Sequence, residues 1–394
     1  MPFGTPRPAP SLSRNSTEPL APGAHLGMLG GGQLGRMFTE AAQRLGYRVV
    51  VLEPNQPCPA GLLADKHLVA GYDQTGALDQ LGEMCEAASY EFEAVPAQAV
   101  EYLRNRITVR PDAQPLSVAQ SRLAEKRFAS KYTPATPPVP YQPVADAAQI
   151  PAALEQVGAP CILKTDRLGY DGKGQAVVET LEEAEAAFAR FDGVSCVLER
   201  QLDLQQEVSV IAARDCEQCV VYPVAENEHR NGILHCSRAP ANIPETVKAQ
   251  VQDSVRRIAD ALDYHGVLAV EYFITSEGIF FNEMAPRPHN SGHYTLDACA
   301  ASQFEQQARI LCGLPLGDPA QHTPAVMINL LGDLWNGCEP DWAPLEGDPT
   351  VRLHLYGKEE ARPGRKMGHL CVLNSDPDVA YARACELYRG LSHE

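Results

Sequence analysis

The sequence predicts a multidomain protein of mixed α/β and α+β architecture that begins with a doubly wound, Rossmann-like domain. Strand-like and helix-like segments alternate from residue 25 onwards, which is typical of a parallel sheet with crossover helices. A Pro-rich segment at 133–140 interrupts this pattern, and two runs rich in β-branched and aromatic residues later flank a short turn at 276–278. The chain has 394 residues, 44% of them hydrophobic and 21% charged, which suffices for two or three domains with their own cores.

The first domain is indicated by a βαβ pattern. The apolar run His25–Leu29 predicts a strand, the amphipathic stretch 33–45 predicts a helix, and 48–53 predicts the next strand. Farther along, the apolar strand around Ile162 begins a second, smaller unit. We therefore expect a flexible tail over 1–24, a Rossmann-like domain over 25–125, a second unit over 126–204 and a third unit over 205–394.

Charge and hydropathy limit the class of ligand. Lys and Arg number 33 against 50 Asp and Glu, and the net charge of −17 argues against a general nucleic-acid or anionic-membrane binder. A small-molecule ligand is therefore expected. No apolar run approaches the roughly 20 residues of a membrane span, and the first two dozen residues lack the apolar core of a signal peptide. These features predict a cytoplasmic protein.

The 12 cysteines are scattered, mostly within apolar runs such as those around Cys161, Cys196 and Cys371. This placement favours reduced, buried thiols over a disulfide framework. Only Cys216 and Cys219 have metal-like spacing. Because no second such pair or neighbouring His pair completes a zinc site, a hairpin turn is the preferred interpretation.

Two glutamates predict a metal site in the third unit. If the turn at 276–278 is centred on Glu277, Glu271 and Glu283 face each other across an antiparallel hairpin. Like charges placed directly opposite each other are destabilising, so the arrangement calls for a cation. Oxygen ligands without His or Cys suit Mg²⁺, which is usually held by carboxylates and substrate phosphates. A pair of solvated strand carboxylates remains the alternative.

The glycine turn at 30–35 matches G-x-G-x-x-G, and Glu53 ends the next strand near the position of a ribose-binding acid. Alone, this pattern would suggest NAD. The same glycines serve any ligand phosphate that must approach backbone N–H groups, and a purely structural tight turn is the third interpretation.

The second unit has features expected of ATP binding. Lys164 ends an apolar strand, and a glycine-rich loop at 169–175 follows it, so backbone amides and a lysine could fold over a polyphosphate. Glu199 ends a later strand and Glu207 follows, where carboxylates could hold adenine and ribose groups. A plain surface hairpin and solvated rim charges are the alternatives.

Strand lysine, glycine loop, hinge carboxylate and paired carboxylates, in that order, resemble the ATP-grasp superfamily. Longer motifs resemble the N5-carboxyaminoimidazole ribonucleotide synthetase family of purine biosynthesis, from about His25 to the C-terminus. These motifs are GGGQLGR at 30–36, SYEFEAVP at 89–96, QSRL at 120–123, GYDGKGQ at 169–175, NEMAPRPHNSGH at 282–293 and RPGRKMGH at 362–369.

The resemblance implies an ATP-grasp fold and a ligase that couples ATP hydrolysis to carboxylation of 5-aminoimidazole ribonucleotide by bicarbonate, through carboxyphosphate. It further implies ATP and Mg²⁺ as cofactors, with Mn²⁺ as the alternative ion, and a homodimer. Another ATP-grasp ligase of purine metabolism, an NAD-dependent dehydrogenase and a non-catalytic nucleotide sensor stay open as other interpretations.

The resemblance also assigns residues to ATP and its metal. Glu271 and Glu283 would carry the metal, while Ala285 stands where many ATP-grasp enzymes have an Asn ligand, which leaves one protein oxygen fewer. The residues implied for nucleotide binding are Arg122, Lys164, Gly169, Tyr170, Asp171, Gly172, Lys173, Gly174, Gln175, Glu199, Arg200, Gln201, Leu202, Glu207, His229, Asn282 and Glu283.

For the carboxylation itself, the resemblance implies that Asp171 orients or deprotonates the amine. The implied catalytic residues are Asp171, Arg287, His289, Asn290 and Lys358, and the implied substrate-binding residues are Gln33, Glu93, Arg287, Ser291, Lys358 and Arg365. The cations at 358, 362, 365 and 366 cluster in an otherwise acidic chain, which suits a socket for the 5′-phosphate. A solvated basic loop is the alternative.

Overall fold

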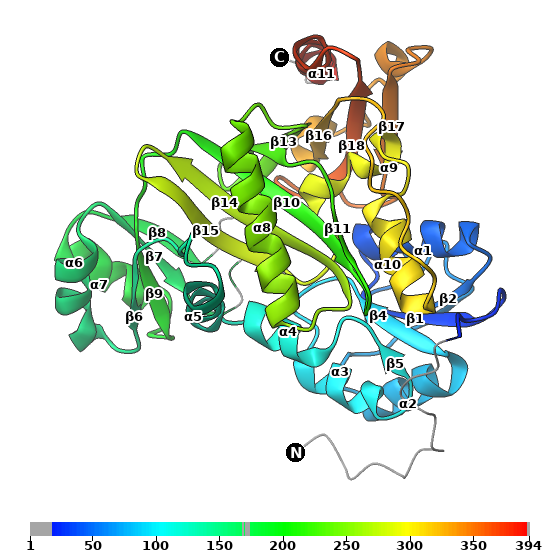
Figure 1. Cartoon of the computed structure of the whole chain (residues 1–394), viewed down its shortest axis with the longest axis horizontal. Coiled ribbons are helices and arrows are strands. Elements are labelled where there is room, and N and C mark those ends of the chain that lie inside the picture. Colours follow the sequence, from blue (N-terminus) through cyan, green and yellow to red (C-terminus); the bar gives the residue numbers. More distant parts are fainter. Residues whose placement is uncertain (1–17, 168, 170–173, 392–394) are drawn as a thin grey trace.

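The chain folds around three sheets in a computed structural model that describes residues 18–167, 169 and 174–391 (Figure 1). The first sheet is parallel, with five strands in the order β3-β2-β1-β4-β5. The strands are β1 (His25–Leu29), β2 (Arg48–Leu52), β3 (Lys66–Leu68), β4 (Ala87–Tyr90) and β5 (Thr108–Val109). The predicted βαβ start is confirmed, with α1 (Gln33–Arg44) ending one residue earlier than expected.

Helices cover both faces of this first sheet, as a doubly wound fold requires. Alternating residues of β1 explain the two layers, because Met28 packs with Phe38 of α1 while Leu29 packs with Leu78 and Leu116 on the other face. The helices on that second face are α2 (Thr75–Met84), α3 (Ala97–Arg104) and α4 (Ala113–Ala119).

A smaller antiparallel sheet follows the linking helix α5 (Arg122–Tyr132). Its strand order is β6-β9-β7-β8, and α6 (Ile150–Val157) and α7 (Leu181–Arg190) pack on it through a separate apolar core. The strands are β6 (Tyr141–Val144), β7 (Cys161–Thr165), β8 (Gln175–Val178) and β9 (Cys196–Arg200). Figure 1 shows this unit at the left, beyond the end of the large nine-stranded sheet, which is called the central sheet below.

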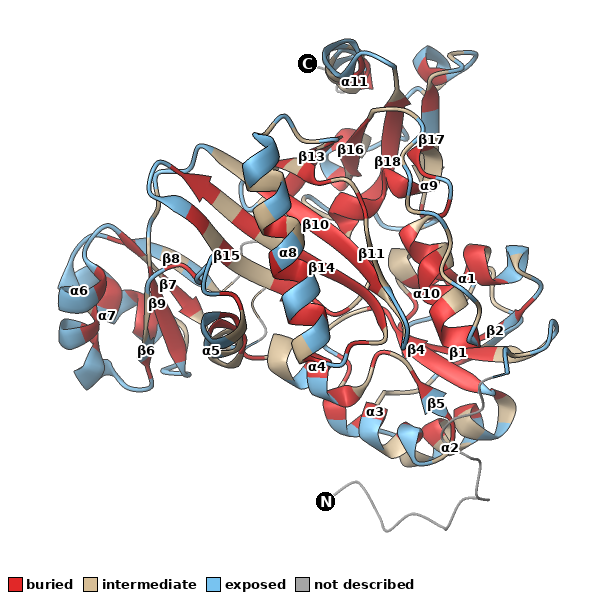
Figure 2. Cartoon of the chain, in the orientation of Figure 1, coloured by how far each residue is buried: buried red, intermediate tan, exposed pale blue. Residues whose placement is uncertain are grey.

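The third sheet has nine antiparallel strands in the order β15-β14-β10-β12-β13-β16-β18-β17, with β11 paired to β10. Its strands are β10 (Gln206–Arg214), β11 (Cys219–Val221), β12 (Ala225–Arg230), β13 (Ile233–Ala239), β14 (Gly266–Thr275), β15 (Gly278–Ala285), β16 (Ala325–Leu331), β17 (Val351–Leu355) and β18 (Lys366–Leu373). Figure 2 shows the long helix α8 (Glu245–Ala261) with its outer face exposed and its inner face buried against β10 and β14. At the far end, α11 (Pro377–Leu391) covers β16 and β18.

Helix α10 (Gln303–Cys312) joins the first and third sheets, although it lies between strands of the third sheet in sequence. Its residue Phe304 packs in the apolar core beside α1. Gln307 donates a hydrogen bond to the hydroxyl of Ser89 at 2.9 Å, and Arg110 donates to the carbonyl of Ile310 at 2.6 Å. The short helix α9 (Thr295–Ala298) precedes it. Through these contacts, helix α10 fixes the position of the Rossmann-like sheet relative to the central sheet.

The β14–β15 hairpin differs from the predicted register in one respect. The turn has two residues, since Thr275 pairs with Gly278, so it is not centred on Glu277. A bulge between Val270 and Tyr272 then adds one residue on β15. Glu271 consequently lies opposite both Asn282 and Glu283, and the predicted proximity of the two glutamates holds for a different reason.

The cysteine predictions are confirmed. All 12 cysteines are free, and Cys161, Cys196 and Cys371 are buried. Cys216 lies in the turn between β10 and β11. These strands form a hairpin, since Arg214 of β10 pairs with Cys219 of β11. Among the helices of the described residues, none has the length and apolar composition needed to cross a membrane.

Candidate active site

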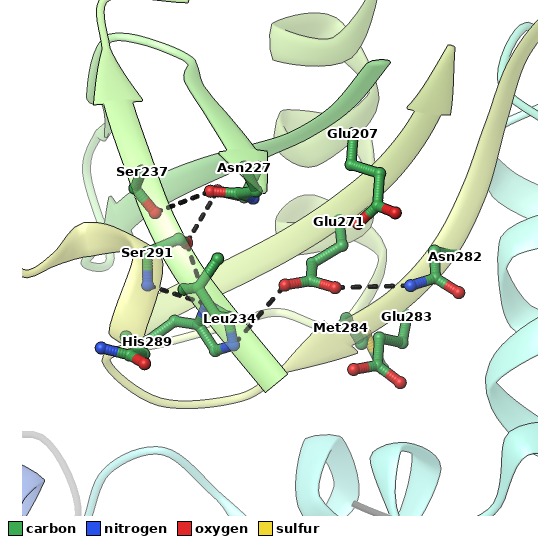
Figure 3. Close-up of polar contacts among 12 residues, drawn as sticks. Glu207, Asn227, Leu234, Ser237, Glu271, Asn282, Glu283, Met284, His289 and Ser291 are labelled. Atoms are coloured by element: carbon green, nitrogen blue, oxygen red, sulfur yellow. Dashed lines mark hydrogen bonds and ion pairs between the residues drawn. The ribbon is translucent and has the colours of Figure 1, made fainter. Parts of the chain in front are cut away.

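The carboxylates of the β14–β15 hairpin gather on one side of the central sheet (Figure 3). The bulge turns Asn282 and Glu283 toward Glu271, and Asn282 Nδ2 donates a hydrogen bond to Glu271 Oε2 at 3.3 Å. Glu207, from the neighbouring strand β10, lies close enough for its charge to act on Glu271. The site therefore brings three carboxylates close together, Glu207 from β10, Glu271 from β14 and Glu283 from β15.

The two predicted metal ligands have opposite surroundings. Burial and then the charge of Glu283 raise the pKa of Glu271 to about 7. Burial also opposes ionisation of Glu283, but Arg122 and Lys164 hold the pKa of Glu283 below its ordinary value, with Arg122 Nη1 at 3.1 Å from Glu283 Oε2. The pKa of Glu271 is raised because its carboxylate is buried and lies beside another carboxylate. A hard divalent cation between these oxygen ligands would stabilise the charged form, so these residues fit Mg²⁺.

A fourth carboxyl group, Glu125, which the sequence analysis missed, contacts the strand beside Glu283. Glu125 on α5 is 3% exposed and accepts a hydrogen bond from the backbone N–H of Met284 at 2.6 Å. Burial and the charge of Glu283 raise the pKa of Glu125 well above its ordinary value. Glu125 therefore fixes the strand beside Glu283 through its hydrogen bond to Met284.

Arg122 is positioned by the N-terminal cap of α5, which is held by a residue of the small antiparallel sheet unit. It is the first residue of α5, whose N-cap is Ser121. Asp166, just after β7, accepts a hydrogen bond from the Ser121 hydroxyl at 2.8 Å and another from the Leu123 N–H at 2.9 Å. Because the carboxylate lies at a helix N-terminus, it also interacts favourably with the helix dipole. Asp166 thus couples the strand that carries Lys164 to the helix that carries Arg122.

Lys164 and a second lysine share one buried carboxylate. Lys164 Nζ donates to Glu199 Oε2 at 2.8 Å, and Lys126 Nζ lies 3.0 Å from Glu199 Oε1. Burial opposes ionisation of Glu199, but the two ammonium groups lower its pKa to about 2. Both oxygens of the Glu199 carboxylate therefore face lysines and position their ammonium groups. Lys126 was missed by the sequence analysis, although its position four residues after Arg122 on a helix was a signal.

Of the predicted glycine loop, the structure describes only the two ends. The carbonyl of Gly169 accepts a hydrogen bond from Arg122 Nη2 at 3.3 Å. Gly174 has a φ of +69°, and Gln175 begins β8 opposite Lys164. The predicted residues Tyr170, Asp171, Gly172 and Lys173 lie outside the described residues.

The segment that follows β9 leads from the small sheet to the central one. Arg200 Nη2 forms an ion pair with Glu277 Oε2 at 2.9 Å, at the turn of the β14–β15 hairpin. Gln201 donates its backbone N–H to the carbonyl of Pro160 at 3.2 Å, and Leu202 is half-buried. The segment therefore has the position of a hinge between the two sheets.

Glu207 and His229 come together as predicted for one binding region. His229 Nδ1 lies 2.5 Å from Glu207 Oε2. Burial lowers the pKa of His229, but the hydrogen bond to Glu207 and the nearby carboxylates outweigh burial and raise it overall. The two residues line a cleft of about 360 Å³ together with Gln206 and Asn227.

His289 connects the carboxylates to a chain of hydroxyl groups (Figure 3). Ser209 donates to Ser291 Oγ at 2.7 Å, Ser291 Oγ lies 2.9 Å from His289 Nδ1, and His289 Nε2 lies 3.7 Å from Glu271 Oε1. The Ser291 N–H also donates to His289 Nδ1, so the proton of the neutral ring belongs on Nε2, which faces Glu271. Burial, followed by Arg287, lowers the pKa of His289 well below its ordinary value.

Asn290 has a different environment from its predicted catalytic partners. It is 7% exposed and exchanges two amide hydrogen bonds with Asn329 on β16, at 3.0 and 2.7 Å. Both polar atoms of the side chain are thus engaged within the protein. Asn290 holds the backbone turn that presents His289 and Ser291.

An ion pair joins the first domain to the same turn. Arg287 Nη2 lies 2.7 Å from Glu93 Oε1 and donates to Glu93 Oε2 at 2.9 Å. The Glu93 backbone is fixed in turn, because Gln120 donates to its carbonyl at 2.8 Å. Gln33, the first residue of α1, is half-buried beside the glycine turn. The predicted substrate-binding residues of the first domain thus lie on its side facing the central sheet.

The glycine turn of the first domain is occupied by the protein's own carboxylates. Glu91 accepts hydrogen bonds from the N–H groups of Gly32 and Gly35, the latter at 2.6 Å, and Glu53 accepts from Gly31 at 3.0 Å. Burial raises the pKa of Glu91, while these amides lower it. The amides that would bind a dinucleotide pyrophosphate are therefore already engaged, and Glu53 is committed to the turn.

The basic segment after β17 contains the remaining predicted cations. Lys358 Nζ donates to the carbonyl of Lys366 at 2.7 Å, and its charge lowers the pKa of Glu91 in the first domain. Arg365 is half-buried and donates to the carbonyl of Glu360 at 2.8 Å. Lys358 therefore faces the glycine turn across the interface, while Arg365 holds its own loop.

Three known families match successive parts of the chain. They are the ribonucleotide synthetase preATP-grasp domain at residues 24–120, the ATP-grasp domain at 129–304 and the phosphoribosylaminoimidazole carboxylase C-terminal domain at 325–383. The first match covers the parallel sheet. The ATP-grasp match covers the four-stranded sheet with Lys164 and strands β10 to β15 of the nine-stranded sheet with Glu283, and the third match covers β16 to β18 of that same sheet.

Whole-chain relatives agree with this assignment. N5-carboxyaminoimidazole ribonucleotide synthase of Brucella melitensis is 43% identical over 361 residues, which cover 89% of this chain and 96% of that protein. A solved ADP complex of N5-carboxyaminoimidazole ribonucleotide synthetase is 40% identical, with a TM-score of 0.89 over 94% of this chain and 97% of that one. The Aspergillus clavatus enzyme, solved with ADP and 5-aminoimidazole ribonucleotide, is 28% identical, with a TM-score of 0.85 over 95% of this chain and 100% of that one. The chain therefore belongs to the N5-carboxyaminoimidazole ribonucleotide synthase family of ATP-grasp ligases.

Proposed function

We propose that this protein catalyses the ATP-dependent carboxylation of 5-aminoimidazole ribonucleotide by bicarbonate, giving N5-carboxyaminoimidazole ribonucleotide, ADP and phosphate. The observation that carries the proposal is the meeting of Glu271 and Glu283 with Arg122 and Lys164 from two other elements. Paired carboxylates for a metal beside two cations form a site for the phosphates of a nucleotide. The named relatives supply the substrate class.

In the first step, an oxygen of bicarbonate attacks the γ-phosphorus of ATP and ADP leaves, so the product is carboxyphosphate. Glu271 and Glu283 would hold Mg²⁺, or Mn²⁺ as the alternative ion, and the bound ion would neutralise charge on the phosphate oxygens. Arg122 and Lys164 add fixed positive charge beside the same oxygens. Because Asp166 and Glu199 already hold these side chains, little reorganisation is needed as charge moves in the reaction.

In the second step, the exocyclic amine of the ribonucleotide forms a bond to the carboxyl carbon, phosphate leaves, and the amine loses a proton. Carboxyphosphate is short-lived in water, so the reacting groups must be enclosed. Arg287 and His289 lie near the acidic centre, and His289 presents an N–H toward it through the Ser291 contact. We assign proton acceptance to Asp171 in the glycine loop, and Asn290 to the support of the turn that carries His289.

The ribonucleotide lies, in this proposal, between the first domain and the central sheet. Glu93 and Gln33 contact it from one side and Arg287 from the other, so the Glu93–Arg287 ion pair opens to admit it. Lys358 and Arg365 bind its 5′-phosphate, for which two cations of different shape offer a point charge and a planar fork. The adenine of ATP lies at the segment 199–202, and its ribose at Glu207 beside His229.

The assay is ADP release by the purified protein with ATP, Mg²⁺ and bicarbonate, with and without 5-aminoimidazole ribonucleotide. Strong dependence on the ribonucleotide, with the carboxylated product identified by NMR from ¹³C-bicarbonate, is expected. ADP release that ignores the ribonucleotide would assign the site to another acceptor. An NAD-dependent dehydrogenase is not favoured, since Glu91 and Glu53 engage the turn amides.

We further propose that the enzyme acts as a homodimer in the cytoplasm. The family resemblance carries the oligomeric state, and analytical ultracentrifugation of the full chain is its test. Sedimentation as a monomer at working enzyme concentrations would reject the dimer without affecting the proposed reaction.

A further inference from the structure

A group of polar side chains outside the proposed active site lies where β17 and β18 meet α9. His354 on β17 pairs directly with His369 on β18 in the antiparallel register, so the two side chains extend from the same face of the sheet. Asp297 of α9 lies above them. These three residues come from two distant segments of the sequence, and none has a role in the proposed carboxylation.

The polar atoms of the three side chains lie close together. His354 Nε2 lies 2.9 Å from Asp297 Oδ2, and the rings of His354 and His369 stack with centroids 4.4 Å apart and planes at 10°. One ring nitrogen of each histidine and one carboxylate oxygen of Asp297 all lie within 4.8 Å of one another. In the part of the chain that the structure describes, this is the one group of His, Cys, Asp and Glu side chains that meets such a criterion for three ligands.

A second observation concerns His369. The residue is fully buried, and Tyr356 Oη lies 2.8 Å from its Nδ1, which fixes the orientation of the ring. Its Nε2 has no hydrogen-bond partner among the described residues. A buried polar atom without a partner costs free energy on the order of 1–3 kcal/mol, so it calls for an explanation. An Asp297–His354 hydrogen bond alone explains two of the three residues but leaves this nitrogen unused.

We propose that Asp297, His354 and His369 form a binding site for a divalent transition-metal ion of the Zn²⁺ type. Two imidazoles and one carboxylate favour such an ion over Mg²⁺, which prefers oxygen ligands. With metal–ligand bonds of about 2.0–2.2 Å, the ligand atoms would lie roughly 3.3 Å apart, so the partly exposed ring of His354 must turn out of its stack with His369 to bind the same ion. Burial lowers the pKa of His369 well below its ordinary value, which keeps the ring in the neutral form that binds metals.

Access and second contacts are consistent with such a site. The side chain of His354 is 29% exposed and that of Asp297 is 11% exposed, which leaves an approach from solvent and an open fourth position. Tyr356 supplies the outer contact that metal-bound histidines usually have. The ion would tie α9 to the β17–β18 pair, and thereby stabilise the C-terminal end of the central sheet.

The test is titration of the full-length protein with ZnCl₂ by calorimetry, in the presence of excess Mg²⁺ to fill the glutamate pair. All proteins carry Cys216→Ser and Cys219→Ser, because these thiols are close in sequence and Cys216 is exposed. We expect one Zn²⁺ per chain and a raised Tm. His354→Gln and Asp297→Asn should each weaken binding at least about tenfold, since even outer contacts contribute about 10- to 100-fold. His322→Gln, at an exposed histidine, is the matched control and should bind as the parent does.

Co²⁺ substitution separates this site from thiol ligands. Nitrogen and oxygen ligation gives visible d–d bands without the thiolate charge-transfer band, and these bands should disappear in His354→Gln. Unchanged Zn²⁺ affinity in both folded variants, or no Zn²⁺ binding by the parent, would overturn the proposal. Because His354 and Asp297 are partly exposed, their variants are expected to keep the wild-type Tm without metal. ADP release by the parent, measured separately, keeps failure of this site distinct from failure of the proposed carboxylation.

Discussion

Glu271 and Glu283 face each other across the bulge of the β14–β15 hairpin, yet their pKa values move in opposite directions. Burial and the charge of Glu283 raise the pKa of Glu271 to about 7, whereas Arg122 and Lys164 keep the pKa of Glu283 low. One strand pair therefore holds a carboxylate whose charged form is favoured beside a carboxyl group that titrates near neutral pH. This pairing makes both metal affinity and stability depend on pH.

The first prediction concerns Glu271 and pH. The folded protein binds the Glu271 proton more tightly than the unfolded chain, so this stabilisation is complete below about pH 4.5 and is lost as pH rises through about 7. Without metal, Glu271→Gln should therefore gain stability relative to wild type over this range, by on the order of 1–3 kcal/mol. The measurement is Tm of both proteins in EDTA from pH 4.5 to 8. Parallel curves would contradict the assigned pKa.

The same titration predicts the behaviour of the metal. A bound divalent ion must displace the Glu271 proton, so Mg²⁺ affinity in the presence of ADP should rise between about pH 5 and 7. Calorimetry in two buffers of different ionisation enthalpy would count the released proton directly. Equal heats in the two buffers at pH 6 would show that no proton leaves.

The second prediction concerns Glu283. Glu283→Gln removes a charged metal ligand and the partner of Arg122, so ATP turnover should fall by on the order of 10²–10³-fold or more. The fold should persist, because Glu283 is half-buried at its site rather than part of an apolar core. Glu277→Gln at the hairpin turn is the matched control, since its side chain is 59% exposed and pairs with Arg200 away from the proposed metal ligands. Wild-type turnover in a folded Glu283→Gln protein would reject the metal assignment.

Local apolar patterns were sufficient to predict the first strand and helix. The apolar run His25–Leu29 forms a strand that is buried on both faces, and the helix at 33–45 forms because its apolar residues repeat at helical intervals. The hairpin register was less predictable. Sequence alone does not reveal a bulge, so the predicted turn at Glu277 was wrong while the meeting of Glu271 and Glu283 was right.

The residues missed in the site share a physical reason. Lys126, Glu125 and Asp166 act through partners that lie far away in sequence, so their roles leave no local pattern beyond the spacing of Lys126 four residues after Arg122. The motif at 282–293 likewise gave no sign that the amide of Asn290 exchanges hydrogen bonds with Asn329 on a distant strand. Side-chain roles of this kind become visible only when distant strands are placed next to each other.

The third prediction concerns Gly30. Its φ of +115° favours glycine, and a Cβ there would overlap the side chain of Glu91. Gly30→Ala should therefore lower the free energy of unfolding by about 2–4 kcal/mol. Gly76→Ala in α2 is the matched control, because a Cβ at that position meets no atom within 4 Å and should stabilise the helix by about 0.5–1 kcal/mol. Urea denaturation measures both, and equal stability of the two variants would contradict the role of Gly30.

The fourth prediction concerns Lys126 and its buried carboxylate. Lys126→Met leaves Glu199 with Lys164 as its one remaining lysine, and removal of one partner from a buried ion pair is costly. The free energy of unfolding should fall by about 2–4 kcal/mol. Because Glu199 then holds Lys164 more tightly, the KM for ATP should rise. Lys131→Met, an exposed lysine on the same helix, should change stability by less than about 0.5 kcal/mol.

A double variant separates charge from packing at this position. If the cost of Lys126→Met comes from the uncompensated Glu199 charge, adding Glu199→Gln should recover part of the lost stability, because the carboxylate that lacks its partner is gone. If the cost comes from lost side-chain packing, the losses in free energy of unfolding from the two substitutions should add, or the double variant should lose more than their sum. The ATP kinetics distinguish the cases further, since the neutral Gln no longer restrains Lys164 and the KM effect of Lys126→Met should diminish. A full double-mutant cycle with no coupling energy would reject the shared-carboxylate arrangement as the means of positioning Lys164.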